Sequence, residues 1–336
     1  MLKKLFIILI LFIFISGLGY YFWYLPSQEP DEPVEEQVNL TKLSDPTVIS
    51  PVNSYDNNSL WYGLSTGRLM QYDLSANNAT EYPLPQIVGN SFKKVYWPKQ
   101  GNDFIAISDF NDVAQYSYFS FKEKQYKLLP RNIVNLDWMG NSSKIVIIWE
   151  GTDKKTSLVV SNPDASGYKV LRELPWPDMV VKASPTNDTA LVYRANSADP
   201  VSKIYLFDLA TGTYVESVAE GRSTGAVWSP KGDSFIFTRL VDGKNKVLLH
   251  NLSTGVNTET GLSTSIDKIA YNDDGTKVYI AVLSEELNRE DIWEYDVSNK
   301  EMISVFNSAT HRVKNIIAIG SELFFLNHEN ALYSFK

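Results

Sequence analysis

One short stretch in the second half of the chain, "LSEELNRED", places Glu285, Glu286, Glu290 and Asp291 close together. Carboxylates grouped in this way can act as general acid and general base. The stretch also joins two expected strands, and charged residues at a loop tip are commonly solvated. The sequence therefore leaves two interpretations open for this stretch: a solvated loop, or a surface that contacts a protein partner.

Histidine and cysteine, the usual ligands of transition metals, are scarce. The histidines are His250, His311 and His328, without a spacing such as His-x-x-x-His, and the chain has no cysteine. The stretch "NDDGTKVY" (272–279) starts like a calcium loop but lacks the further oxygen ligands that such a loop needs. The pattern Gly-x-Ser-x-Gly occurs in "GLSTG" (63–67) and "GRSTG" (221–225), but neither leads into the long helical period that the nucleophile elbow of a serine hydrolase needs. We therefore predict no catalytic, cofactor-binding or metal-binding residues, and a chain that is not an enzyme.

Trp176 is the aromatic residue with the clearest potential as a contact residue. It lies between two prolines in "LPWPD", on a connection between expected strands. Loops commonly carry binding residues, and tryptophan is frequent at the energetic centre of interfaces. We therefore predict that Trp176 is exposed and contacts a partner. The remaining tryptophans of the repeats are expected to pack between sheets; they are Trp61, Trp97, Trp138, Trp149, Trp228 and Trp293.

Two recurring patterns indicate the elements that must position these side chains. The first is an apolar stretch, a polar turn and a strand, as in "AVWSPKGDSFIFT"; its anchor residues lie 41 to 45 positions apart and are Trp97, Trp138, Ala183, Trp228 and Tyr271. The second is an apolar alternation that ends in a polar turn, as in "IYLFDLATGT". Each unit then holds four short strands, which is typical of a β-propeller blade.

Seven such units follow one another along the chain. They begin near Ile49, Lys93, Val134, Val180, Gly225, Asp267 and Val313. The seventh unit supplies three strands, whereas "QVNLTKLS" (37–44) alternates like a strand and precedes the first unit. We predict an all-β, seven-bladed propeller over residues 37–336, with 37–44 as the closing strand of the last blade. Closure of the ring removes exposed sheet edges.

The stretch "WSPKGDSFIF", together with "IYLFDLATG", resembles the TolB-like and related WD-type propeller repeats. The resemblance extends over roughly residues 37–336. The Trp-Asp dipeptide and the Gly-His signature of true WD repeats are absent, so the intracellular WD scaffolds match less well. The resemblance implies a propeller fold. It does not single out an activity, because such repeats occur in binding modules, assembly factors and accessory domains of hydrolases.

The N-terminal region has the pattern of a membrane anchor. Residues 1–4 carry Lys3 and Lys4, and residues 5–25 contain no charge. A helix of that length covers a hydrocarbon core of roughly 30 Å. The lysines favour a cytoplasmic N-terminus, so the propeller is expected on the extracytoplasmic side of the cell membrane, after an acidic, proline-rich linker at 26–36. A cleaved signal peptide is the alternative, with an apolar region at 5–15.

Composition restricts the partners. The net charge is −8, which makes a general affinity for nucleic-acid phosphate improbable. The leading hypothesis is a membrane-anchored, non-enzymatic scaffold that binds a protein or a glycan through one face of the propeller. Two alternatives are an enzyme, hydrolase or lyase, that acts on envelope polysaccharide in the central channel, and an accessory subunit of a separate peptidase.

Overall fold

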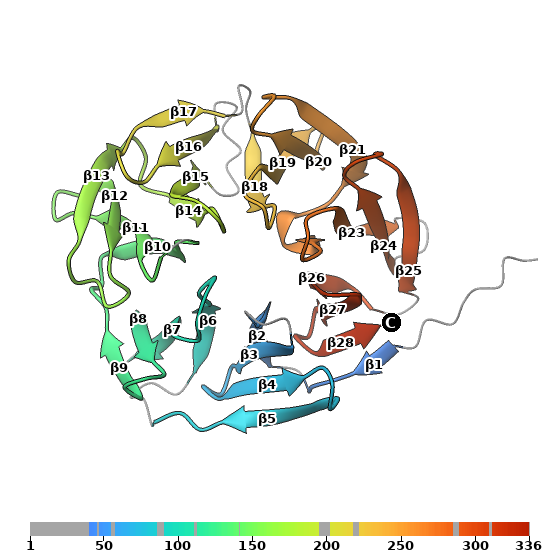
Figure 1. Cartoon of the computed structure of the whole chain (residues 1–336), viewed down its shortest axis with the longest axis horizontal. Coiled ribbons are helices and arrows are strands. Elements are labelled where there is room, and N and C mark those ends of the chain that lie inside the picture. The colour runs from blue at the N-terminus through green and yellow to red at the C-terminus, as the bar shows by residue number, and fades with distance from the viewer. Residues whose placement is uncertain are drawn as a thin grey trace, which may run out of the picture. The chain divides into compact units, whose positions relative to one another are not determined.

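Seven antiparallel sheets of four strands each surround a common axis in the computed structural model (Figure 1). The structure describes residues 40–45, 47–54, 58–85, 91–110, 113–140, 142–194, 202–217, 222–284, 289–308 and 311–335. The predicted N-terminal segments, 1–4, 5–25 and 26–36, lie outside these residues. Within the part of the chain that is described, no helix is long and apolar enough to cross a membrane. The prediction of an all-β, seven-bladed propeller with four-stranded blades is confirmed.

We number the blades in chain order, each from its innermost to its outermost strand. Blade 1 contains β2 (Val48–Asn53), β3 (Ser59–Leu64), β4 (Leu69–Asp73) and β5 (Asn78–Tyr82), and blade 2 contains β6 (Phe92–Tyr96), β7 (Phe104–Phe110), β8 (Val113–Ser120) and β9 (Gln125–Leu128). Blade 3 contains β10 (Ile133–Trp138), β11 (Ile145–Glu150), β12 (Thr156–Ser161) and β13 (Lys169–Leu174). Blade 4 contains β14 (Met179–Ala183), β15 (Thr189–Arg194), β16 (Ile204–Asp208) and β17 (Tyr214–Glu216). Blade 5 contains β18 (Ser223–Trp228), β19 (Ser234–Val241), β20 (Lys244–Asn251) and β21 (Asn257–Ser263); a 3₁₀ turn, η2 (Ile266–Lys268), leads to blade 6, which contains β22 (Ile269–Tyr271), β23 (Lys277–Ser284), β24 (Arg289–Asp296) and β25 (Met302–Ser308).

Blade 7 combines strands from both ends of the described chain. Its inner strands are β26 (Val313–Ile319), β27 (Glu322–Asn327) and β28 (Leu332–Phe335), and its outermost strand is β1 (Leu40–Lys42). Leu40 lies opposite Phe335 in the antiparallel register of β1 and β28. The edge of β28 is therefore covered by the first strand of the chain, as Figure 1 shows beside the C-terminus.

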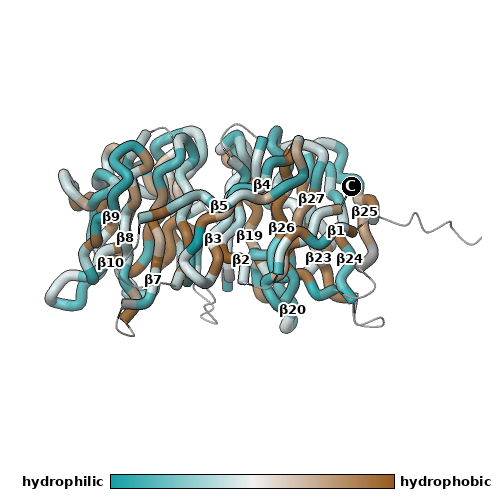
Figure 2. Tube along the Cα trace, turned by 90° about the horizontal axis from the view of Figure 1, so that it is seen from below, coloured by the Kyte–Doolittle hydropathy of each residue, from teal (hydrophilic) through white to brown (hydrophobic). Residues whose placement is uncertain are grey.

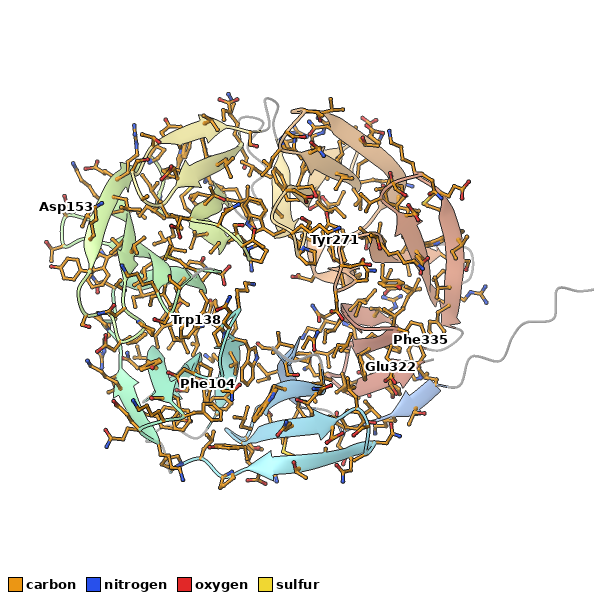
Figure 3. The ribbon with its side chains drawn as sticks, in the orientation of Figure 1. Phe104, Trp138, Asp153, Tyr271, Glu322 and Phe335 are labelled. Atoms are coloured by element: carbon orange, nitrogen blue, oxygen red, sulfur yellow. The ribbon has the colours of Figure 1, made fainter. Side chains whose placement is uncertain are left out.

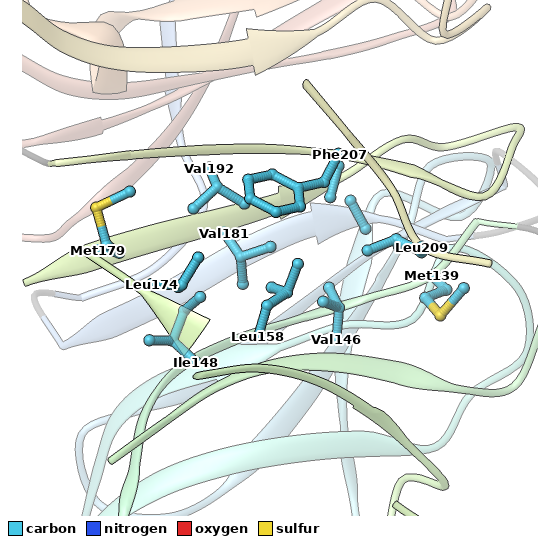
Figure 4. Packing of buried hydrophobic residues seen from close by; sticks show 12 residues of the cluster. Met139, Val146, Ile148, Leu158, Leu174, Met179, Val181, Val192, Phe207 and Leu209 are labelled. Atoms are coloured by element: carbon cyan, nitrogen blue, oxygen red, sulfur yellow. The ribbon is translucent and has the colours of Figure 1, made fainter. Parts of the chain in front are cut away.

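Apolar contacts between neighbouring blades form the core. The second strand of blade 3, β11, is buried from Ile145 to Ile148, as a short continuous apolar run favours. Ile148 and Leu158 of blade 3 belong to one cluster with Val181 and Phe207 of blade 4 (Figure 4). Outer strands such as β5 are exposed, and hydrophilic residues are frequent in the loops on both faces of the ring (Figure 2). Stacking of blades thus fixes their inner ends around the axis.

Three of the predicted anchor tryptophans join each blade to the one before it. The indole Nε1 of Trp97 donates to the Ser50 carbonyl at 2.7 Å, and that of Trp138 donates to the Tyr96 carbonyl at 2.9 Å. Nε1 of Trp228 donates to the carbonyl of Lys182 at 2.9 Å. A buried indole N–H needs such an acceptor. The bond therefore explains why tryptophan recurs at this repeat position, and it fixes the inner strands that face the axis.

The second sequence pattern corresponds to a turn between the third and fourth strands. Oδ1 of Asp73 accepts hydrogen bonds from the N–H groups of the second and third residues after it, and Asp296 does the same. These are Asx turns, which a short carboxylate or amide side chain stabilises. Hydrogen bonds from Ser75 and Ser298 hold the pKa of Asp73 and of Asp296 below the usual carboxyl value.

Candidate functional site

The structure places the acidic stretch differently from the prediction. Glu290 lies in β24 and its side chain is only 2% exposed. Its carboxylate forms an ion pair with Lys268, and its Oε2 accepts the Val313 N–H at 2.8 Å. The solvated-tip interpretation is therefore wrong for Glu290, which is a structural link between blades 6 and 7 and is too buried to contact a partner.

The other members of the acidic stretch do not form a carboxylate cluster in the described residues. Asp291 is the next residue along β24, and its Oδ1 lies 3.3 Å from Nε of Arg289, with both side chains mostly buried. Glu285 and Glu286 lie outside the described residues. The stretch therefore supplies no acid–base pair in the part of the chain that the structure describes.

Trp176 is half-buried rather than exposed. Its ring packs against the core cluster between blades 3 and 4, and its centroid is 6.2 Å from that of Tyr205. The flanking prolines therefore direct the indole onto the protein surface instead of into solvent. Its role as a partner contact stays a prediction.

The histidines are dispersed around the ring. His250 is buried in β20, with Nδ1 2.6 Å from Oδ1 of Asn257, and His311 lies with its ring centroid 4.6 Å from that of Tyr333. No group of three or more His, Cys, Asp or Glu side chains that could hold a metal occurs among the described residues.

Four charged side chains lie on or next to the innermost strands of different blades, and the charges of three of them act on the fourth, Lys94. They are Lys94 on β6, Asp137 on β10, Lys182 on β14 and Asp267 in η2. We call this group the axial site. In the view along the ring, the drawn side chains leave the centre open, and Trp138, beside Asp137, lies near the inner end of blade 3 (Figure 3). The convergence follows from the fold, because each blade brings its innermost strand to the axis.

Backbone hydrogen bonds fix Asp137. Its Oδ1 accepts the Trp138 N–H at 2.9 Å, and its Oδ2 accepts the Ala183 N–H of blade 4 at 3.0 Å. Asn135, two residues earlier, accepts the Val181 N–H at 2.9 Å in the same manner. These bonds satisfy backbone N–H groups on the inner strand of blade 4, so the Asp137 carboxylate is a fixed part of the wall.

The two lysines of the axial site have no carboxylate partner among the described residues. Nζ of Lys94 lies 4.5 Å from the centroid of the Tyr96 ring, and Lys182 is half-buried. Desolvation by the surrounding protein, and then the nearby Lys182 ammonium, lower the pKa of the Lys94 amine below its usual value. Asp137 and Asp267 oppose this shift but do not cancel it. The Lys94 side chain is nevertheless solvent-accessible, as a binding group must be.

This arrangement can bind an anion and can accept a proton. A lysine ammonium group that has no carboxylate partner in the protein can form a hydrogen bond to the carboxylate of a ligand. Such a charge-assisted hydrogen bond is stronger than one between neutral groups. An amine whose pKa is lowered by desolvation and by a neighbouring cation is a candidate for a general base. Lys182 therefore suits anion binding, and Lys94 suits proton acceptance.

Sequence reasoning missed the axial site, although a signal was present. The position before the anchor residue holds Val227 and Ala270 in blades 5 and 6 but Asp137 and Lys182 in blades 3 and 4. A charge at a repeat position that is apolar elsewhere indicates a local function rather than packing. Lys94 carries no such signal, because it lies two positions earlier in its unit.

A scan against known protein families finds no match, and no curated protein matches this chain in sequence. Solved structures do match its fold. An oligogalacturonate lyase in complex with manganese has a TM-score of 0.66 at 13% identity, over 89% of this chain and 93% of that chain. An oligogalacturonate lyase from Vibrio parahaemolyticus has a TM-score of 0.67 at 13% identity, over 90% and 94% of the two chains. The propeller domain of Cps50 (Swd1) from Myceliophteria thermophila has a TM-score of 0.63 at 10% identity, over 89% and 99%.

At such low identity the likeness shows the fold alone. It nevertheless contradicts the prediction that the chain is not an enzyme. That prediction relied on the absence of known catalytic motifs, whereas the matched propeller accounts for 93% and 94% of the two lyase chains. A propeller of this size therefore needs no added domain to be an enzyme. The TolB-like and WD-type assignment rests on the sequence motifs, and the manganese named for one lyase has no matching donor group among the residues described here.

Proposed function

We propose that the chain is a carbohydrate-active enzyme that binds an acidic oligosaccharide at the axial site and cleaves it by β-elimination. The observation that carries this proposal is the pair of lysine side chains on innermost strands, Lys94 on β6 and Lys182 on β14, which have no carboxylate ion-pair partner in the described part of the ring. The shared fold with oligogalacturonate lyases supports the choice of a uronate as the ligand.

Each residue has a distinct role in this reaction. Lys182 binds the uronate carboxylate, which stabilises the negative charge that develops when the neighbouring C5–H bond breaks. Lys94, in its neutral form, takes the C5 proton. The electron pair of that bond forms the C4=C5 double bond as the C4–O bond breaks, and the Lys94 ammonium returns the proton to the departing oxygen. No other reactant is needed, and the product is an unsaturated sugar.

The test uses the full chain in detergent and oligogalacturonates of defined length. The unsaturated product is followed by its ultraviolet absorbance. Lys94→Met should lower kcat by about 100-fold or more, the low end of what a general base contributes. Lys182→Met should raise KM by about 10-fold or more and lower kcat as well, because it removes a charged hydrogen-bond donor that binds the carboxylate and stabilises the charge developing beside it. Methionine retains the apolar stem in both variants.

Lys99→Met is the matched control, because Lys99 is an exposed lysine just beyond β6. It should behave as the unaltered protein does. Absence of product at every pH from neutral to about 10 would overturn the catalytic proposal. Unchanged binding of oligogalacturonate in Lys182→Met would overturn the axial site as its location.

We also propose that residues 5–25 anchor the chain in the cell membrane, with the propeller on the extracytoplasmic side. The uncharged run behind Lys3 and Lys4 supports this placement. Protease added to intact spheroplasts should then degrade the propeller. Protection of the propeller until the membrane is opened would contradict the proposal.

A further inference from the structure

A second pocket lies far from the axis, on the outer strands of blade 3. It has a volume of about 300 Å³ and is lined by residues of β11, β12 and β13 and of the connections between them. The residues that matter here are Trp149, Asp153, Lys155, Tyr168 and Glu173, and we call this group the rim pocket. Its volume is at the lower end of the range for ligand pockets, so it suits a ligand of about one ring.

Two aromatic rings form one wall of the rim pocket. The centroids of Trp149 and Tyr168 are 5.8 Å apart, and the ring planes differ by only 20°. Tyr168 is 61% exposed and the neighbouring Val170 is 55% exposed. The Trp149 ring also contacts the core cluster between blades 2 and 3, which holds it in place. The protein thus presents a rigid aromatic surface to solvent instead of burying it.

Polar groups line the pocket beside this surface. Nζ of Lys155 lies 3.0 Å from Oε2 of Glu173, so one ion pair supplies both hydrogen-bond donors and acceptors. Oδ1 of Asp153 accepts the Lys155 N–H at 3.1 Å and fixes the loop. A Cβ atom on Gly151 would lie 2.8 Å from that same oxygen, so a side chain at this position would displace the Asp153 carboxylate.

The charges of the rim pocket disfavour an acidic ligand. Lys155 is neutralised by Glu173, and Asp153 adds a negative charge. A ligand with many hydroxyl groups and no charge can instead bond to both members of the ion pair. One face of a pyranose ring carries C–H groups, which pack against the electron-rich face of an aromatic ring.

From this geometry we infer that the rim pocket binds a pyranose ring of a neutral oligosaccharide, stacked on Trp149 and Tyr168 with its hydroxyl groups bonded to Lys155 and Glu173. The site is independent of the axial site, since none of its residues belongs to that group. It would hold a neutral chain at the outer rim, whatever reaction takes place at the axis.

The test is calorimetric titration of the full chain in detergent with cellohexaose, repeated with chitohexaose. Tyr168→Ala removes an exposed ring, so folding is expected to be unaffected. It should weaken binding about 3- to 10-fold, which is the value of one aromatic stacking contact. Ile303→Ala is the control, because Ile303 is a 58% exposed apolar side chain on β25, the outermost strand of blade 6; it should leave binding unchanged.

Three results would overturn the inference: no heat of binding with either sugar, affinity in Tyr168→Ala equal to that of the unaltered protein, or an equal loss of affinity in Tyr168→Ala and Ile303→Ala. Lys182→Met separates the two sites, because it should leave cellohexaose binding intact. Failure of oligogalacturonate cleavage with normal cellohexaose binding would contradict the axial proposal and leave the rim pocket supported.

Discussion

Replacing Glu290 with Gln tests the link between blades 6 and 7. The carboxylate bonds to Lys268 in η2 through Oε1 and to the Val313 N–H of β26 through Oε2. Glutamine keeps one acceptor oxygen but removes the charge, so Lys268 is left as a cation that is only 19% exposed. Breaking a buried pair by removing one partner costs about 3–5 kcal/mol. We expect the low end, about 3 kcal/mol, because Lys268 retains some contact with water.

Urea unfolding of the full chain measures this loss as a lower midpoint at unchanged slope. In a thermal scan, about 3 kcal/mol corresponds to a Tm roughly 6 °C lower for a domain of this size. Glu81→Gln is the matched control, since its pair with Arg68 has side chains 48% and 54% exposed; it should cost less than about 1 kcal/mol. If Glu290→Gln costs no more than Glu81→Gln, the buried pair does not stabilise the ring as argued here.

Three further outcomes are expected. Trp228→Phe keeps most of the ring but loses the bond to the Lys182 carbonyl, so urea unfolding should show a loss of about 1–2 kcal/mol. The folded state holds the pKa of Asp73 and of Asp296 low, so the stability from their turns is full above the unfolded value of about 3.9 and is lost as pH falls below it; a pH series of urea midpoints measures this loss. Deletion of residues 40–42 uncovers β28, and light scattering should then show association of the open edges.

Most of the architecture could be predicted because the residues that determine it recur from one repeat of the sequence to the next. The tryptophan anchors recur because each indole must donate to the blade before it, as Trp97 and Trp138 do. The Asx turns recur because the same hairpin needs the same acceptor. The residues of each Asx turn are close together in the sequence, and the tryptophans recur at a fixed spacing. Both features can therefore be recognised in the sequence without a structure.

The environment of single charged residues could not be predicted in the same way. Glu290 belongs to a stretch with the composition of a solvated loop, yet β24 begins at Arg289 and its alternation turns Glu290 inward. Its partner Lys268 is more than twenty residues away, and its other partner, Val313, belongs to the next blade. Burial of this carboxylate therefore depends on how two blades stack, which no local pattern records.

The axial site, too, could not be predicted from a local sequence pattern. Its lysines also explain how a chain with a negative net charge could bind an acidic ligand. A chain with a net charge of −8 should repel an acidic ligand at long range. At physiological salt, however, exposed charges farther apart than about 8 Å are largely screened. Lys94 and Lys182 are flanked by protein, where charges interact more strongly than in water. The local pair therefore determines whether a carboxylate binds. Asp153 has the opposite effect at the rim pocket, where the local charge favours a neutral ring.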